Sequence, residues 1–254
     1  MTERLDCGSK GMTQAYISFP KMENIGSRWK RVLPLASKVG KGLSIDSRAQ
    51  LLATKHWLEA IDPLHRYGEN LKLYFDAWLN SQSSQPFFFW LDFGHGKKID
   101  LVECSRAQLQ RLCIRYLGHK EREEYEVIIQ NGKLIYKQNG GLLNTPKGMK
   151  YIYVLSTSRK VFVGIKNKGV FQHSSFLAGA TVISAGRLVV SDGILQAIWA
   201  YSGHYCPTEE SFQRLIQFLD EQQVDLKNVK LCAIDDDVIP TLVSKSDTTS
   251  CARN

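Results

Sequence analysis

The strongest constraint on how this chain can fold is the dipeptide Asn131-Gly132, which lies between the alternating runs YEVII and KLIYKQ. Asn-Gly favours a two-residue hairpin turn because both turn positions need a positive φ angle. Further β-branched runs follow: KYIYVL, KVFVG, and then RLVV and ILQAIW, which Ser191-Asp192-Gly193 separates in the manner of a second hairpin. We therefore expect an antiparallel meander from Tyr125 onward.

The residues before Tyr125 have helical rather than alternating periodicity. Apolar and small residues recur at helical spacing over 44–61, and Asp62-Pro63 ends that run. A second helix is expected over 71–78, whereas PFFFWLDF resembles a buried strand bounded by Pro86 and a glycine pair. A third helix is expected after Ser105, with apolar positions Leu109, Leu112, Cys113 and Tyr116 on one side.

A last helix is predicted over 208–223, where Thr208 can cap the first turn and apolar residues recur at offsets of 0, 3, 4 and 7 from Phe212. Helices, then a meander sheet, then a C-terminal helix correspond to an α+β fold. We expect one domain over 28–235. Segments 1–27 and 236–254 lack sustained periodicity, so we expect them to be disordered tails.

Composition limits the classes of function. A chain of 254 residues with 43% hydrophobic and 23% charged residues can bury one sizeable core. Its six cysteines include no C-x-x-C pair and its histidines have no metal-like spacing, so we expect neither a metal nor a cofactor. No run approaches the ~18 apolar residues of a membrane span. The net charge of +8 is spread along the chain, so no nucleic-acid partner is expected.

Several long strings share their order with a known family. They are SKVGKGLS, HWLEAIDPLHRYGENL, PFFFWLDFGHGK, KEREEYEV, FQHSSFLAG, AGRLVV and SGHY followed by PTEE, and they span about Arg28 to Ala233. Through them the chain resembles the plant IQ-motif-containing (IQM) calmodulin-binding family. The resemblance implies a calmodulin-linked regulatory protein of plant calcium and stress signalling, in cytoplasm and nucleus. Its folded domain would bind an unidentified protein partner.

An IQ motif itself requires Ile-Gln followed by basic residues at helical spacing. Ile129-Gln130 runs into the Asn-Gly turn, and Ile216-Gln217 is followed by acidic residues, so neither pair qualifies. The remaining candidate for calmodulin is an apolar and basic segment made of Trp29, Lys30, Arg31, Val32 and Leu33. The alternative is that Trp29 packs onto the domain while the basic residues face water.

An enzyme is the competing hypothesis. The segments HSSF and SGHY supply His173, Ser175, His204 and Tyr205, and Glu209 begins the following helix. Together they could form a nucleotide-handling cleft that loosely resembles that of ADP-ribosyltransferases, with Ser156-Thr157-Ser158 as a further hydroxyl run. The alternative is structural. The histidines and hydroxyl groups would form hydrogen bonds with buried backbone atoms at a corner of the sheet, and the negative charge of Glu209 would stabilise the N-terminus of the helix through its dipole.

Overall fold

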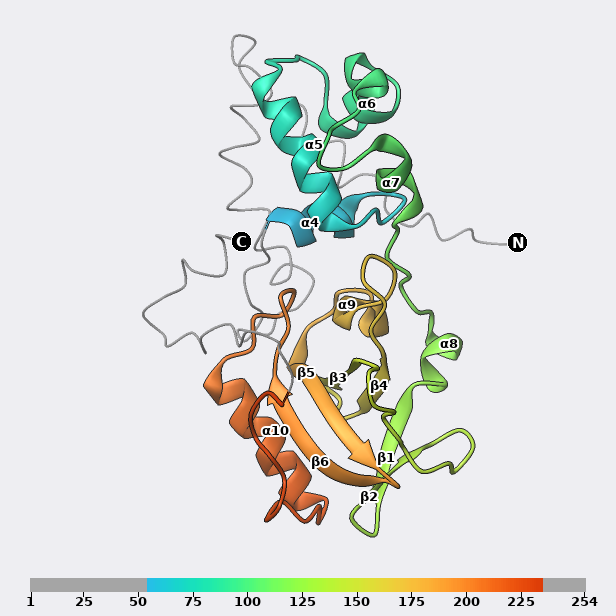
Figure 1. Ribbon diagram of the computed structural model, residues 1–254, viewed down its shortest axis with the longest axis vertical. Coiled ribbons are helices and arrows are strands. Elements are labelled where there is room, and N and C mark those ends of the chain that lie inside the picture. The colour runs from blue at the N-terminus through green and yellow to red at the C-terminus, as the bar shows by residue number, and fades with distance from the viewer. Residues whose placement is uncertain (1–53, 235–254) are drawn as a thin grey trace, which may run out of the picture.

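The computed structural model describes residues 54–234, in which helices precede a six-stranded sheet (Figure 1). The first helices are α4 (Thr54–Ile61), α5 (Gly68–Asn80), α6 (Phe87–Asp92), the 3-10 helix η1 (His95–Lys98), α7 (Arg106–Arg111) and α8 (His119–Glu123). The strands are β1 (Glu126–Gln130), β2 (Lys133–Tyr136), β3 (Tyr151–Ser156), β4 (Val161–Ile165), β5 (Val182–Ser191) and β6 (Ile194–Ala200). Helix α9 (His173–Leu177) separates β4 from β5, and α10 (Glu209–Glu221) follows β6. This order confirms the predicted α+β fold.

The sheet has the strand order β2-β1-β4-β3-β5-β6, and every neighbouring pair is antiparallel. Both predicted tight hairpins are present. Asn131 and Gly132 have φ angles of 52° and 73°, and Asp192 and Gly193 have 49° and 76°. Positive φ at both central positions matches the twist of the flanking strands, which is why these dipeptides fix the register of β1–β2 and β5–β6.

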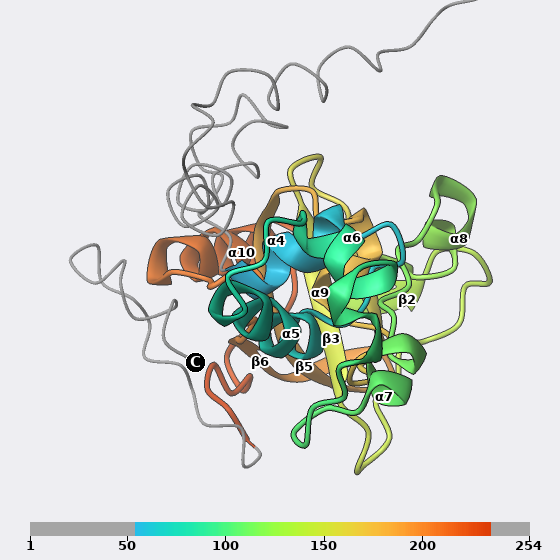
Figure 2. The same ribbon diagram turned by 90° about the horizontal axis from the view of Figure 1, so that it is seen from above.

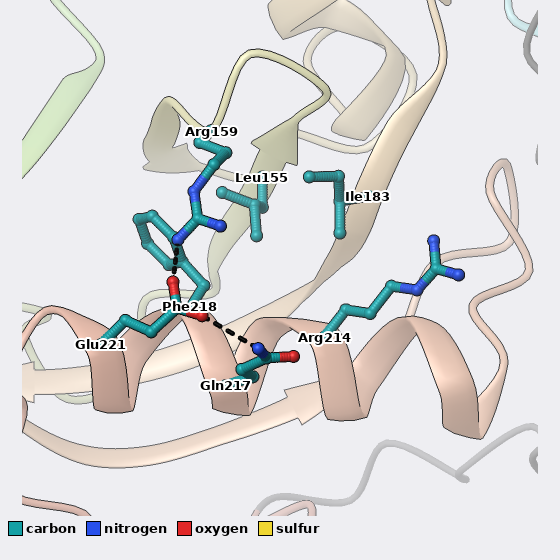
Figure 3. Close-up of a pocket in the computed structure, with 7 residues that line it drawn as sticks. All are labelled: Leu155, Arg159, Ile183, Arg214, Gln217, Phe218 and Glu221. Atoms are coloured by element: carbon teal, nitrogen blue, oxygen red, sulfur yellow. Dashed lines mark hydrogen bonds and ion pairs between the residues drawn. The ribbon is translucent and has the colours of Figure 1, made fainter.

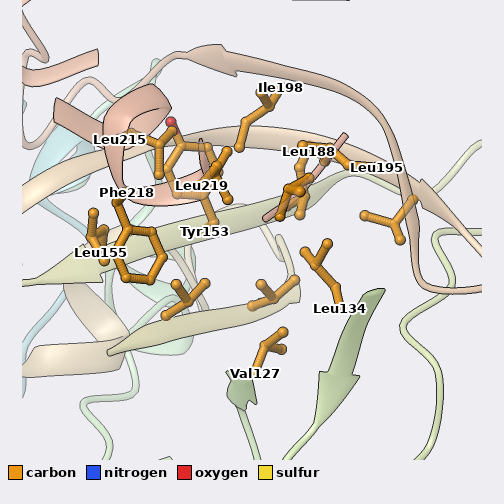
Figure 4. Packing of buried hydrophobic residues seen from close by; sticks show 14 of the residues in the cluster. Val127, Leu134, Tyr153, Leu155, Leu188, Leu195, Ile198, Leu215, Phe218 and Leu219 are labelled. Carbon is orange, nitrogen blue, oxygen red and sulfur yellow. The ribbon is translucent and has the colours of Figure 1, made fainter. Parts of the chain in front are cut away.

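The two faces of the sheet are covered by different helices. Helix α10 packs its Phe212, Leu215, Phe218 and Leu219 onto one face, where they meet alternate residues of β3, β4, β5 and β6 (Figure 4). The short helix α9 covers part of the other face with Phe176, which is fully buried. Because side chains alternate along a strand, each strand contributes to both layers.

The helices α4 to α7 form a separate aromatic layer over one end of the sheet (Figures 1 and 2). Its core includes Trp57, Trp78 and Trp90, and α5 and α6 contribute Phe75 and Phe87. Burial of each large apolar side chain contributes about 1.5–3 kcal/mol. The molecule therefore has distinct hydrophobic clusters for its helices and for the two faces of its sheet.

The prediction of a strand for PFFFWLDF is wrong, because these residues form α6. Phe87, Trp90 and Leu91 are buried at offsets of 0, 3 and 4, which is the spacing of one helical face. Pro86 precedes the first turn, where a missing backbone N–H has no cost. Packing of this face on α5 outweighs the strand preference of aromatic residues.

The segment HSSF is helical and forms most of α9. Ser175 Oγ accepts the backbone N–H of Gln172 at 3.0 Å and so stabilises the start of α9. Ala178 then adopts a left-handed conformation, φ 50°, and ends the helix.

One further prediction about the helical region needs correction. Helix α7 ends at Arg111 instead of extending to Tyr116, because Arg66 and Cys113 form a β-bridge that holds the following chain extended. The charged connection after it contains α8. Of the helix predicted over 44–61, the structure describes Thr54–Ile61. The tails and the Trp29 segment lie outside the described residues.

A buried ion-pair network joins α4 to α6. The guanidinium of Arg66, 1% exposed, donates to both carboxylate oxygens of Asp62 at 2.8 and 2.9 Å and to both of Asp92 at 2.7 and 3.0 Å. Bidentate pairing of this kind satisfies the donors of a planar guanidinium group in a fixed geometry. Removing the cation would leave Asp62, itself fully buried, without its charge partner.

We therefore predict that Arg66→Met lowers the free energy of unfolding by about 3–5 kcal/mol, as breaking a buried pair usually does. Urea unfolding followed by circular dichroism measures this loss. The matched control is Lys72→Met, which removes the exposed pair between Lys72 and Asp76 on α5 and should cost less than about 1 kcal/mol. Equal losses in the two variants would contradict a structural role for the network.

Candidate functional site

A buried carboxylate, Glu59 of α4, lies where the helical layer meets α9. Its Oε1 accepts a hydrogen bond from Gln172 Nε2 at 2.7 Å, with longer contacts to Tyr116 Oη (3.4 Å) and Ser174 Oγ (3.5 Å). Its Oε2 accepts the backbone N–H of Gly68 at 3.1 Å. Glu59 is fully buried. One carboxylate thus holds together the start of α5, the segment after α7 and the start of α9, and we name these five residues the Glu59 cluster.

Burial raises the pKa of Glu59 from 4.5 to about 7, and the hydrogen bonds from Gly68, Tyr116, Ser174 and Gln172 partly oppose that rise. The group therefore titrates near neutral pH. Burial and the Glu59 charge also raise the pKa of Tyr116 well above its usual value, so this phenol stays protonated.

Three buried histidines adjoin this cluster. The His56 ring, also from α4, meets the His204 ring edge-on with centroids 4.8 Å apart. His204 in turn lies 4.6 Å from the ring of Tyr205. Neither ring nitrogen of His56 or His204 has a hydrogen-bond partner of normal geometry. His173 differs, because its Nε2 lies 2.9 Å from the carbonyl oxygen of Gly186. Since a carbonyl only accepts, that nitrogen carries the proton.

All three imidazoles are neutral at pH 7. Burial, helped by the Lys55 charge, lowers the pKa of His56 to about 4, although the Gly203 backbone opposes this. Burial likewise lowers the pKa of His173 to about 4, and that of His204 well below 6.5 with contributions from the other two histidines. The group has the electrostatics of a closed interior and not of a solvated cleft.

The fold brings HSSF and SGHY together. Tyr205 donates its phenol hydrogen to the carbonyl oxygen of Ala180, just beyond α9, at 2.9 Å. Its ring packs against the cluster that contains Phe176. Ser175 is fully buried and accepts a backbone N–H within α9. Glu209 lies apart from them on the exposed first turn of α10, where it accepts a hydrogen bond from Gln213 at 2.7 Å.

Sequence reasoning missed the centre of this site. Glu59 and His56 stand three residues apart on α4, so both point from one helical face, and the face is otherwise apolar. Charged and polar side chains are rarely buried, so a carboxylate and an imidazole on an otherwise apolar helical face are the sequence signal that could have indicated Glu59 and His56 as site residues. Their partner Gln172 is more than a hundred residues away in the chain, and only the tertiary fold brings it near.

Two surface depressions lie elsewhere. The first, about 320 Å³, lies beside α10, where the guanidinium of Arg159 stands 5.1 Å above the Phe218 ring and pairs with Glu221 (Figure 3). The second, about 590 Å³, lies between α8 and the sheet and contains Ser156 and Ser158 of the Ser-Thr-Ser run.

Each depression is lined by residues from several elements. The first is lined by Leu155, Arg159, Ile183, Arg214, Gln217, Phe218 and Glu221. In the second, Glu126 pairs with Lys137 at 2.9 Å and with Lys160 at 3.6 Å. In the first depression, Arg159 pairs with Glu221 and Arg214 pairs with Glu210. These four basic side chains therefore already have carboxylate partners.

Among residues 54–234, no group of three or more histidine, cysteine, aspartate or glutamate side chains is arranged to hold a metal ion. No helix within the same range is both long enough and apolar enough to span a membrane.

Comparison with known proteins identifies the family. Residues 121–212 match the model of the IQ motif-containing protein middle domain. The IQ domain-containing proteins IQM5 and IQM1 of Arabidopsis thaliana are 58% and 57% identical to this chain over 217 residues, which is 85% of the chain. IQM4 of the same plant is 54% identical over 223 residues, or 88% of the chain. The chain belongs to the IQM family.

The matched region covers 44% of the length of IQM5 and of IQM1, and 42% of IQM4. This IQM chain thus spans less than half of the relatives it matches. No solved structure matches it.

The buried histidines predict that acid destabilises this IQM fold. Unfolded histidine takes up a proton near pH 6.5, whereas His56 and His173 in the folded state do so only near pH 4. Their contribution to stability is present above pH 6.5 and is lost as the pH falls toward 4. In chemical unfolding from pH 7 to 4, His204→Phe should show a shallower loss than the wild type. The control is His95→Phe, at an exposed position of η1, and its free energy of unfolding should fall with decreasing pH as steeply as that of the wild type. If the free energy of His204→Phe fell just as steeply, the buried histidines would not be the cause of the acid sensitivity.

The raised pKa of Glu59 predicts that its contribution to stability depends on pH in the opposite direction. Its pKa is raised on folding, so its contribution favours the folded state below pH 4.5 and is lost as the pH rises through about 7. The free energy of unfolding of the wild type, measured relative to Glu59→Gln, should therefore fall between pH 4.5 and 7 by up to about 3 kcal/mol. A constant difference across this window would refute the raised pKa. Glu123→Gln, at an exposed position of α8, is the control and should give such a constant difference.

Proposed function

We propose that this chain is a calmodulin-linked regulatory protein of plant calcium and stress signalling, acting in cytoplasm and nucleus, whose folded part binds a protein partner. The observation that carries the proposal is the identity of 50–58% to Arabidopsis proteins named for their IQ domains. IQ segments are helices that enter a calmodulin lobe through an apolar face bordered by cations.

The Ile-Gln pairs of the folded part do not have that form. Ile129-Gln130 ends strand β1 next to the hairpin turn. In α10, Ile216 packs against the sheet core, and Gln217 donates a hydrogen bond to Glu221 at 2.9 Å. A helix whose apolar face already packs on the sheet has none left for calmodulin. Calmodulin binding is therefore assigned to the segment Trp29 to Leu33, which precedes the described residues.

A surface on α6 supports the partner-binding role of the folded part. Phe89 and Phe93 are 51% and 74% exposed, with ring centroids 6.1 Å apart. The exposed Lys97 and Lys98 of η1 lie four and five residues after Phe93 in the chain. Adjacent exposed aromatic rings are unusual on a free surface and are frequent anchors in protein interfaces. The two lysines would favour an acidic partner.

The enzyme alternative, a nucleotide-handling cleft between HSSF and SGHY, has no support from the relatives. Its histidines are buried and neutral, and His173 and Ser175 bond to backbone groups. Glu209 takes no part in the group. These features favour the structural role, in which buried polar groups hold α9 and the turn before α10.

The proposal predicts that calorimetric titration of the full 254-residue chain with calmodulin gives calcium-dependent binding. Trp29→Ala should weaken that binding tenfold or more, because a buried tryptophan anchor is worth at least about 1.4 kcal/mol. Phe93→Ala removes another exposed aromatic residue and is the matched control, with affinity unchanged.

Two outcomes of this titration would contradict the proposed calmodulin binding. Absence of binding both with calcium and with a chelator would refute a calmodulin input to this chain. Equal affinity of Trp29→Ala and the wild type would refute the Trp29 segment as the anchor.

A further inference from the structure

The depression of about 320 Å³ beside α10 is lined by both apolar and charged side chains. Leu155 of β3, Ile183 of β5 and Phe218 of α10 are its apolar residues, and Arg159 and Arg214 are its cations. In Figure 3 the two arginines lie on opposite sides of Leu155 and Ile183. Sites for small molecules combine apolar lining with a few polar groups and have volumes of about 300–1,000 Å³. The depression therefore has the composition of a site for a small ligand.

Both arginines keep donors that no protein group uses. Arg159 donates to Glu221 through Nη2, and Arg214 donates to Glu210 through Nη2 at 2.7 Å. Neither guanidinium forms another hydrogen bond or ion pair with the residues of 54–234. The Nε and Nη1 donors of each planar group therefore remain for a ligand. Both ion pairs lie at the surface, where such pairs contribute little to stability, so an incoming anion can share each guanidinium.

The backbone conformation of Arg159 indicates that its side chain has a role. Its N–H donates to the carbonyl oxygen of Ser156 at 3.0 Å, which closes the turn between β3 and β4, and its φ angle is 60°. This left-handed conformation usually belongs to glycine, because a Cβ atom is disfavoured there. A long side chain at such a position suggests a function for its guanidinium group. The Phe218 ring, 5.1 Å below, holds that group beside the depression.

We propose that this depression binds a small carboxylic acid with an apolar body. A carboxylate matches the planar guanidinium group, which can donate two parallel hydrogen bonds to it. The pairing of Arg159 with Glu221 shows that this guanidinium already accommodates a carboxylate. A ring or chain attached to the ligand carboxylate would pack on the half-buried Ile183 and remove apolar surface from water. The site is separate from the proposed calmodulin segment and from the exposed aromatic pair of α6.

The probe is benzoate, a single aromatic ring that carries one carboxylate. Calorimetric titration of the full chain at low salt should give saturable binding. The matched ligand is benzamide, which has the same ring and nearly the same shape but no charge, and it should bind at least tenfold more weakly. Equal affinity for the two compounds would overturn the proposal, because the arginines would then contribute nothing to binding.

Two variants remove the arginines one at a time. Arg159→Gly removes the guanidinium and introduces the residue that best tolerates a φ of 60°, so the turn should be retained. Arg214→Gln keeps a good helix former at a partly exposed position of α10. Each variant should weaken benzoate binding at least fivefold, and Arg214→Gln decides the question if Arg159→Gly is unstable. Wild-type affinity in Arg214→Gln would contradict the proposed site.

Glu221 lines the depression and competes with a ligand for Arg159. Glu221→Gln should therefore bind benzoate more tightly than the wild type does. The matched control is Arg115→Gln, which removes an exposed arginine that pairs with Glu121 away from the depression and should leave the affinity unchanged. If Arg115→Gln weakened binding as much as Arg214→Gln, net charge alone would govern binding and the proposal would fail. Absence of saturable binding to both the wild type and Glu221→Gln would refute it as well.

Discussion

The structure depends on one buried carboxylate. Glu59 accepts hydrogen bonds from Gly68 and Gln172, and so it links the helical layer to α9 on the sheet. The layers on its two sides have separate hydrophobic clusters. Apolar packing is not directional, whereas a carboxylate with several donors specifies a single relative orientation. The cost of burying this charge appears as its raised pKa.

The sequence predicted those elements that depend on neighbouring residues. Both hairpins follow from dipeptides that adopt positive φ, and α10 follows from an amphipathic repeat with a threonine cap. Helix α6 was missed because an aromatic run is compatible with strand or helix, and its packing on α5 decided between them. Helix α9 was missed because its stabilising serine is one of several hydroxyl residues that also suit a strand end.

The site was predicted only in part for the same reason. The approach of HSSF to SGHY could be anticipated from their positions at the ends of strands. The contributions of His56 and Glu59 could not, because they come from a helix more than a hundred residues away. The basic residues of the sheet were also not predictable as a group. Lys150, Lys166 and Arg187 are far apart in the sequence, and only the register of the strands places them on one face. Charge spread in a sequence thus gives little information about charge density on a β-sheet.

The distribution of tryptophan between the layers affects how this protein can be observed. Trp57, Trp78 and Trp90 lie in the helical cluster, whereas Trp199 is the sole indole on the sheet among residues 54–234. Intrinsic fluorescence therefore reports mainly on the helices. If the helical layer opens before the sheet, emission will change while the β-sheet signal in the far ultraviolet persists, so the two optical probes can separate opening of the layers from global unfolding.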